Sequence, residues 1–129
     1  MDIDAVRLYC LAKPGVTEDF PFDEHTLVMK VGGKMFALLG DEFPPRLNLK
    51  CDPLLAENLR AEHRSILPGY HMNKRHWNTL VLNGELPESL IRDLIDHSYE
   101  LVVNGLPAAI HLLLTGAAQE VECSAGEVK

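Results

Sequence analysis

The sequence has few of the features that mark a secreted, membrane-bound or multidomain protein. Its 129 residues suit one domain rather than two. Its three cysteines, Cys10, Cys51 and Cys123, are odd in number and far apart, which favours reduced thiols over a disulfide framework. No apolar run approaches the roughly 20 residues of a membrane span, and the first residues are acidic where a signal peptide would be basic. We therefore expect a cytoplasmic protein with no membrane partner.

The motifs of common enzyme families are also missing. The chain has no GxSxG, HExxH, CxxC or EF-hand pattern, and Gly32-Gly33-Lys34 lacks the spacing of a phosphate-binding loop. The spacing of His63, His71 and His76 matches no closed metal site. We expect no metal, no cofactor and no catalysis. An enzyme that uses His71 or His76 as a general base remains the third alternative.

Charge is unevenly distributed along the chain. The net charge of −7 at pH 7 by itself disfavours a nucleic-acid partner. Residues 46–80, however, carry six basic and three acidic side chains, whereas the segments on either side are acidic. This middle third is either an ordinary solvated surface or an anion-binding face on an acidic protein.

Hydrophobic periodicity predicts a mixture of helices and strands. Helical spacing predicts helices over residues 3–12, after the Asp52-Pro53 cap, and from Pro87 onward. Alternation predicts strands over residues 26–31, 34–39, 46–51 and 76–82. Residues 16–25 are predicted to be an acidic loop, 107–114 a short helix, and 115–129 a flexible tail. Because tight turns join consecutive strands, we predict an α+β domain over residues 1–114 with an antiparallel sheet.

Two details of these elements bear on packing. Gly32 and Gly33 between apolar runs predict a two-residue hairpin turn, since such a turn needs positive φ at both positions. The resulting pairing places Met29 opposite Phe36. Ser98 falls on the apolar side of the last long helix, so we expect a hydrogen bond inside the core rather than a nucleophile.

Two segments combine cations with directional hydrogen-bonding groups. Residues 46–51 alternate between apolar and polar side chains, which gives one strand face the residues Arg46, Asn48 and Lys50. Residues 68–78 bring together cations, amides and two aromatic side chains. The cations would attract phosphates, and Tyr70 and Trp77 would either stack on bases or anchor the loop in the core.

Several pieces of the chain resemble the MmcQ/YjbR family of small bacterial proteins. The most specific is Asn73-Lys74-Arg75-His76-Trp77-Asn78, which follows Pro68-Gly69-Tyr70-His71-Met72. The other matching pieces are Tyr9–Gly15, Lys34–Ala37, Leu49–Pro53, Leu86-Pro87 and Ser98-Tyr99. The resemblance implies a frataxin-like (CyaY-like) arrangement in which two helices pack on one face of an antiparallel sheet. It also implies a non-enzymatic, DNA-binding protein with a double wing motif.

Together these features predict a monomer that binds DNA weakly and in a salt-sensitive manner. The residues expected to contact DNA are Lys30, Lys34, Arg46, Lys50, Asn73, Lys74, Arg75 and His76. The alternative is a module for a small anionic ligand or a protein partner, with a ligand loop that includes Tyr70, His71 and Trp77. A contiguous basic surface would favour DNA, whereas a deep pocket at that loop would favour the small ligand.

Overall fold

The computed structural model describes residues 1–69, 72–110 and 113–114. In chain order its elements are α1 (Ile3–Leu11), β1 (Val16–Asp19), β2 (Thr26–Val31), β3 (Lys34–Gly40), β4 (Arg46–Lys50), α2 (Pro53–Glu62), β5 (Ile66–Pro68), β6 (Trp77–Val81) and α3 (Glu88–Asn104). Residues 108–110 and 113–114 are also helical, within the predicted final helix. The predicted tail over 115–129 lies outside the described residues.

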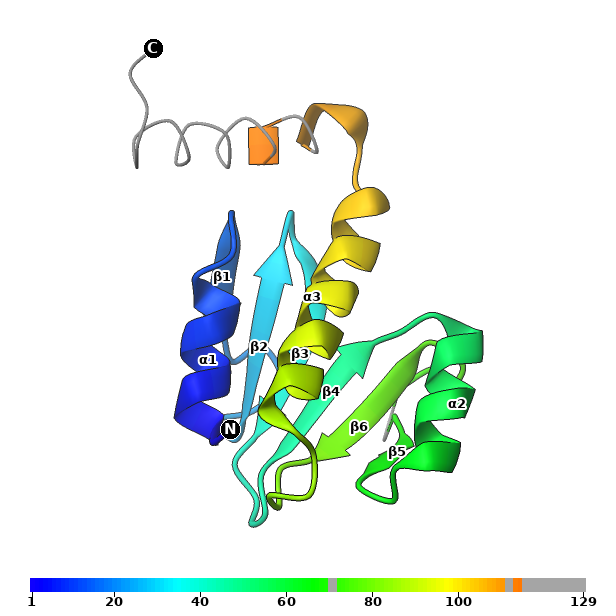
Figure 1. Cartoon of the computed structure of the whole chain (residues 1–129). Coiled ribbons are helices and arrows are strands. Elements are labelled where there is room, and N and C mark those ends of the chain that lie inside the picture. The colour runs from blue at the N-terminus through cyan, green and yellow to red at the C-terminus, as the bar shows by residue number, and fades with distance from the viewer. Residues whose placement is uncertain (70–71, 111–112, 115–129) are drawn as a thin grey trace, which may run out of the picture.

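The strands form one antiparallel sheet in the order β1-β2-β3-β4-β6-β5. All three helices lie on the same side of it (Figure 1): α3 packs over β3 and β4, α1 over β1 and β3, and α2 over β5 and β6. The predicted α+β class with helices on one face is confirmed, although three helices occupy that face where the resemblance implied two. We call the side of the sheet away from the helices the open face.

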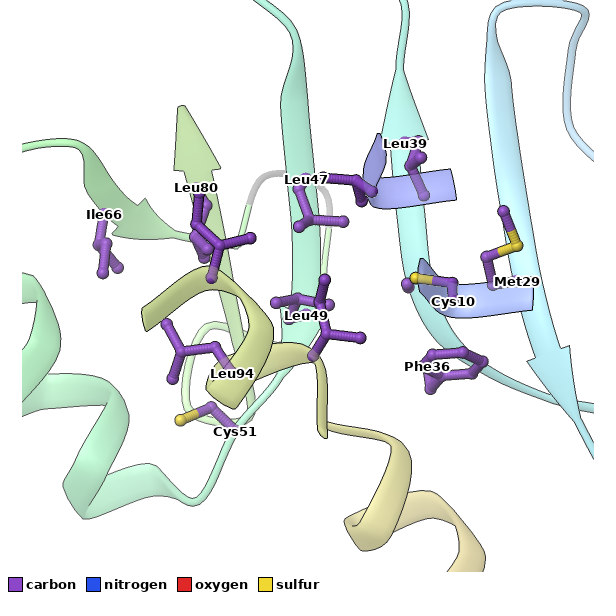
Figure 2. Packing of buried hydrophobic residues seen from close by; sticks show 14 of the residues in the cluster. Cys10, Met29, Phe36, Leu39, Leu47, Leu49, Cys51, Ile66, Leu80 and Leu94 are labelled. Atoms are coloured by element: carbon purple, nitrogen blue, oxygen red, sulfur yellow. The ribbon is translucent and has the colours of Figure 1, made fainter. Parts of the chain in front are cut away.

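The core lies between the sheet and the helices. Figure 2 shows side chains from β2, β3, β4 and β6 meeting residues of α1 and α3 there, among them Met29, Leu47, Leu80 and Leu94. Cys51 is buried beside Leu49, as its position on the strand predicts. No helix among the described residues is long and apolar enough to cross a membrane.

The register of the β2–β3 hairpin differs from the prediction because β3 contains a bulge. Lys30 pairs with Met35 as expected, but Met29 pairs with Ala37 instead of Phe36. Phe36 is the extra residue, so Phe36 and Ala37 are consecutive and both fully buried in the core. The alternation of apolar and polar residues contains no sign of this irregularity.

The Ser98 hydroxyl of α3 stabilises the bulge. Ser98 Oγ donates a hydrogen bond to the Phe36 carbonyl, at 2.5 Å, and accepts one from the Lys50 backbone N–H, at 2.9 Å. The predicted core hydrogen bond of Ser98 is therefore confirmed. The Phe36 ring also packs edge-on against Tyr99, with the ring centroids 5.4 Å apart.

The two edge strands are absent from the sequence prediction. Residues 16–19 were predicted to be loop, but they form β1. Its two core-side residues are Val16, which packs against the core, and Glu18, whose carboxylate accepts two hydrogen bonds from Arg7 of α1, at 2.6 and 2.7 Å. These bonds lower the pKa of Glu18. Glu18 stands at a position where a strand usually has an apolar residue. The sequence of β1 therefore lacks the apolar–polar alternation that marks a strand. The other edge strand, β5, has only three residues.

The helices bury fewer of their apolar residues than periodicity suggests. α2 begins at Pro53 with Asp52 as its N-cap, as predicted. However, Leu54 is 68% exposed and Leu55 is 37% exposed, while Ala56 and Leu59 pack inward. α2 lies over the edge of the sheet formed by β5 and β6, so only a narrow stripe of it can reach the core.

The Gly32-Gly33 turn has the predicted geometry, with φ of +58° and +78°. We expect Gly33→Val to lower the free energy of unfolding by about 1–2 kcal/mol, because a β-branched residue is strained in this left-handed region. A side chain at position 33 would meet no atom within 4 Å, so strain alone should determine the effect. Urea denaturation measures it, with Gly33→Asn as a milder control. A valine variant as stable as the parent would contradict this turn.

The described cysteines, Cys10 and Cys51, are free and buried. Burial raises the pKa of Cys10 to about 12 and that of Cys51 to about 11, so little thiolate exists at neutral pH. Cys123 lies outside the described residues, and we therefore place the test in a Cys123→Ser background. We expect both remaining thiols to react with a chromogenic disulfide only after denaturation. A thiol that reacts rapidly in the native protein, or a missing thiol after denaturation, would contradict this expectation.

Candidate nucleic-acid interface

The strand register brings cations from separate segments to one end of the sheet. The Gly32-Gly33 turn joins β2 to β3 at this end, beside Lys30 and Lys34. Lys50 terminates β4 at the same end, opposite Trp77. The loop that includes residues 72–76 leads directly into Trp77. We define the basic end as Lys30, Lys34, Lys50, Lys74, Arg75 and His76.

Most cations of the basic end have no ionic partner in the part of the chain that the structure describes. Lys30 is half-buried and forms an ion pair with Asp19 of β1, at 3.6 Å. Lys34, Lys74 and Arg75 are exposed, and none of them makes an ion pair with another described residue. This end therefore has a positive local charge, although the whole chain is acidic.

Arg46, which was predicted to act with these residues, lies at the opposite end of β4. Its cross-strand partners are Gly40 on β3 and Val81 on β6. Glu42 and Asp23 lie near this end, so the open face changes from basic to acidic along the strands. A polyanion would be attracted to one end only.

Hydrogen bonds to Asn73 shape the loop that carries Lys74 and Arg75. The Asn73 side-chain oxygen accepts from the Arg75 N–H, at 3.0 Å, and the Asn73 carbonyl accepts from the His76 N–H, at 3.1 Å. Asn73 was predicted to contact DNA, and here its side-chain oxygen shapes the loop. Tyr70 and His71 of the predicted ligand loop lie outside the described residues.

Arg60 of α2 also anchors this loop. The sequence did not indicate this role. Its guanidinium donates to the Lys74 carbonyl, at 3.0 Å, and to the Asn78 side-chain oxygen, at 2.9 Å. Asn78 is buried and in turn donates to the Ala56 carbonyl, at 3.4 Å. Arg60 therefore holds the backbone of the loop at Lys74 against α2, and Asn78 of β6 makes a second contact with the same helix.

A groove of about 600 Å³ lies on the open face, between the loop that precedes β2 and the loop that precedes β6. Its apolar lining comes from Phe22, Met35, Leu38 and Met72. Its polar lining comes from Asp23, Thr26, Glu42, Arg46, Asn48 and Thr79. Met72 lines the groove and Trp77 does not. Because Tyr70 and His71 lie outside the described residues, the predicted pocket of Tyr70, His71 and Trp77 stays a prediction. Nothing in the local sequence around Phe22 or Glu42 indicated this site.

Other residues of the family resemblance join α1 to α3 on the helix side. The Tyr9 hydroxyl donates to Asp96, at 2.8 Å, and Lys13 forms an ion pair with the same carboxylate. Burial, together with the Asp96 contact, raises the pKa of Tyr9 to about 12. The Tyr99 hydroxyl donates to the Pro14 carbonyl, at 2.6 Å. These side chains are occupied in holding the helices together.

The described residues form a small α+β domain whose six-stranded antiparallel sheet has helices on one face, a groove on the other, and a cluster of cations at one end. A family model named YjbR matches residues 11–101. The chain is 41% identical to YjbR of Escherichia coli K12 over 115 residues, which cover 88% of this chain and 98% of that protein. The chain belongs to the YjbR family, as the sequence resemblance indicated.

Further relatives extend this similarity. YyaQ of Bacillus subtilis is 36% identical over 104 residues, covering 69% of this chain and 87% of that protein. The crystal structure of DR2400 from Deinococcus radiodurans, described as a DUF419 domain, superposes with a TM-score of 0.84 at 43% identity and 88% coverage of each chain. A Pseudomonas syringae protein superposes with a TM-score of 0.70 at 32% identity, covering 78% and 98% of the two chains. The fold is shared across these bacterial proteins.

Removal of the Arg60 anchor should loosen the loop. We expect Arg60→Gln to speed tryptic cleavage after Lys74 and Arg75 several-fold, because local opening exposes these bonds to the protease. The free energy of unfolding should fall by about 1–2 kcal/mol, since buried Asn78 loses a partner. Mass spectrometry of the early fragments gives the cleavage rates. Arg64→Gln is the matched control, because the Arg64 side chain is 90% exposed and its ion pair is with Glu85, away from the loop. Equal cleavage rates in both variants would contradict the anchoring role.

Proposed function

We propose that this protein binds nucleic acid through phosphate contacts made by the basic end. The observation that carries the proposal is the convergence of β2, β3, β4 and the loop that includes residues 72–76, which together place five lysine and arginine side chains at one end of the sheet. Lys and Arg bind phosphate oxygens without reading sequence. The proposed interaction is therefore largely independent of sequence.

The acidity of the remaining chain limits the strength of this binding. The net charge is −7, and the end of the open face near Asp23 and Glu42 would repel phosphates. The basic end can neutralise about three to five phosphates. We therefore propose a dissociation constant no tighter than about micromolar at physiological salt. Arg46, at the acidic end, would contribute little to these phosphate contacts.

The proposed activity is binding without catalysis. The Ser98 hydroxyl already makes two hydrogen bonds inside the core, and burial raises the pKa of the Cys10 and Cys51 thiols. These groups are therefore poor nucleophiles. Among the described residues, no three His, Cys, Asp or Glu side chains are placed to hold a metal ion. The burial of these hydroxyl and thiol groups is what supports a binding protein.

The second candidate function is recognition of a small anion at the basic end. The cross-strand pairing of Lys50 with Trp77 favours it, because a cation and an aromatic ring lie side by side at the end of the loop. A nucleic acid and a small anion differ in the number of charges that they present. Competition between a labelled oligonucleotide and inorganic phosphate at constant ionic strength separates the two candidates. If the site recognises a small anion, low concentrations of phosphate should displace the oligonucleotide.

The salt dependence of binding tests the proposed function. Fluorescence anisotropy with a labelled oligonucleotide should give a slope of log K against log[salt] of roughly −3 to −5. Affinity should then fall about a hundredfold or more between 50 and 200 mM salt. Replacing both Lys74 and Arg75 by Ala should flatten the slope by about two units.

A matched control keeps the change in net charge the same. The double variant Arg64→Ala, Arg92→Ala also removes two positive charges, but these residues pair with Glu85 and Glu88, away from the basic end. Its slope should equal that of the parent protein. No binding of the parent protein at low salt, or equal losses in the two double variants, would refute phosphate binding at this end.

A further inference from the structure

We infer that the groove on the open face receives an unpaired nucleobase, so the protein binds single strands in preference to duplex. This inference rests on the proposed phosphate binding and adds the form of nucleic acid that is recognised. Lys30 and Lys50 of the basic end lie on the same side of the sheet as the groove, because Lys30 pairs with Met35 and Lys50 follows Asn48 by two residues. A single strand can use both, because each of its nucleotides presents a base and a phosphate at the same time.

The apolar part of the groove suits a flat ring. Its volume of about 600 Å³ falls in the range of small-molecule sites. Leu38 lies at its base and is 7% exposed, while Phe22 is 63% exposed at its edge. An exposed aromatic ring is the usual stacking partner of an unpaired base. Met35 and Met72 supply polarizable thioethers, which make favourable contacts with aromatic rings.

The polar part of the groove offers both donors and acceptors. A Cβ atom on Gly40 would lie 2.5 Å from Glu42 Oε1, so the Glu42 carboxylate lies over Gly40, whose cross-strand partner is Arg46. Within residues 1–69, 72–110 and 113–114, neither Glu42 nor Arg46 forms an ion pair. A base edge carries donors and acceptors on adjacent atoms, and it can therefore engage the carboxylate and the guanidinium together. A simple anion would be repelled by Glu42 and Asp23.

A third polar group lies between these side chains and the basic end. Asn48 accepts a hydrogen bond from Thr79 through its side-chain oxygen, which leaves the Asn48 amide nitrogen directed at no described residue. Thr79 and Asn48 are cross-strand partners on the open face. Asn48 can therefore donate to a base acceptor in the groove.

The distance between the groove and the cations suits one nucleotide. Asn48 and Lys50 are two residues apart on β4 and point to the same face, which separates their Cα atoms by about 7 Å. A base beside Asn48 would thus place its own phosphate or the next one near Lys50. Repulsion from Glu42 and Asp23 would keep the phosphates away from the other end. The bases of an intact duplex are stacked and paired, so they could not enter the groove.

Four labelled probes of matched design test this inference. They are a mixed-sequence single strand of about 12 nucleotides, its duplex, an abasic strand with the same number of phosphates, and a nucleoside 5′-monophosphate. We expect the single strand to bind about tenfold more tightly than the abasic strand at equal salt, because only the single strand has bases that can stack in the groove. The duplex should bind no more tightly than the abasic strand, and the monophosphate much more weakly.

Two substitutions in the groove locate the base contact. Phe22→Ala should weaken binding of the single strand about tenfold and leave binding of the abasic strand unchanged. Arg46→Gln should act in the same direction. Phe43→Ala is the matched control for the aromatic change, since Phe43 is 97% exposed and does not line the groove. Arg64→Gln is the control for the charge change. Thermal unfolding confirms that each variant is folded.

The outcomes separate this inference from the proposed function. If the abasic strand binds as tightly as the normal strand and both depend on salt, phosphate binding holds and the groove inference is overturned. If neither strand binds at low salt, the proposed function fails, and the groove inference fails with it. If the monophosphate binds as tightly as the strand, the groove is a site for a free nucleotide rather than a single strand. A tenfold loss in Phe22→Ala that is confined to the base-containing strand would support the inference.

Discussion

One buried hydroxyl connects the elements on which the open face depends. Ser98 Oγ joins the carbonyl of the bulged residue Phe36 to the backbone N–H of Lys50. α3 is thereby held against β3 and β4 at the level where β3 becomes irregular. Without a partner, the Phe36 carbonyl would be buried and unsatisfied, which costs about 1–3 kcal/mol. The hydrogen bond from the Ser98 hydroxyl therefore removes this cost of the bulge.

The bulge decides which side chains reach the open face. Because Phe36 and Ala37 are both buried in the core, Met35 and Leu38 are the neighbouring β3 residues that line the groove. Regular alternation would have placed Ala37 on the open face and Leu38 in the core. The same hydroxyl holds Lys50 at the end of β4. Both the groove and the basic end are thus consequences of a contact made on the opposite side of the sheet.

The sequence predicted the fold better than the site. The Gly32-Gly33 turn, the Asp52 cap and the long helix α3 have strong local signals, and each appears as expected. β1 and the bulge were missed because they depend on tertiary partners, namely Arg7 for the carboxylate on β1 and Ser98 for the bulge. The cations were identified by their charge alone. Their division into a basic end and a distant Arg46 requires the strand register, which local periodicity does not supply. The groove was missed because its walls come from separate loops.

The residues that define the family resemblance serve the fold more than they serve the surface. Tyr9, Lys13 and Tyr99 join the helices, and Asn78 holds the loop against α2. Similarity at these positions therefore reports a shared architecture, and function has to be argued from the open face. Lys74 and Arg75 are the exception, since their side chains are exposed within the most specific motif.

The two edge strands of the sheet, β1 and β5, are poorly suited to pair with a second molecule at high protein concentration. A sheet with two free edges could extend by pairing its edge strands with those of a second molecule. β1 instead presents the charged residues Glu18 and Asp19, and β5 is three residues long and ends in Pro68, which has no N–H to donate. Neither edge offers a long apolar template for strand addition. The sheet can therefore lack helices on one face without offering an edge at which molecules would readily aggregate.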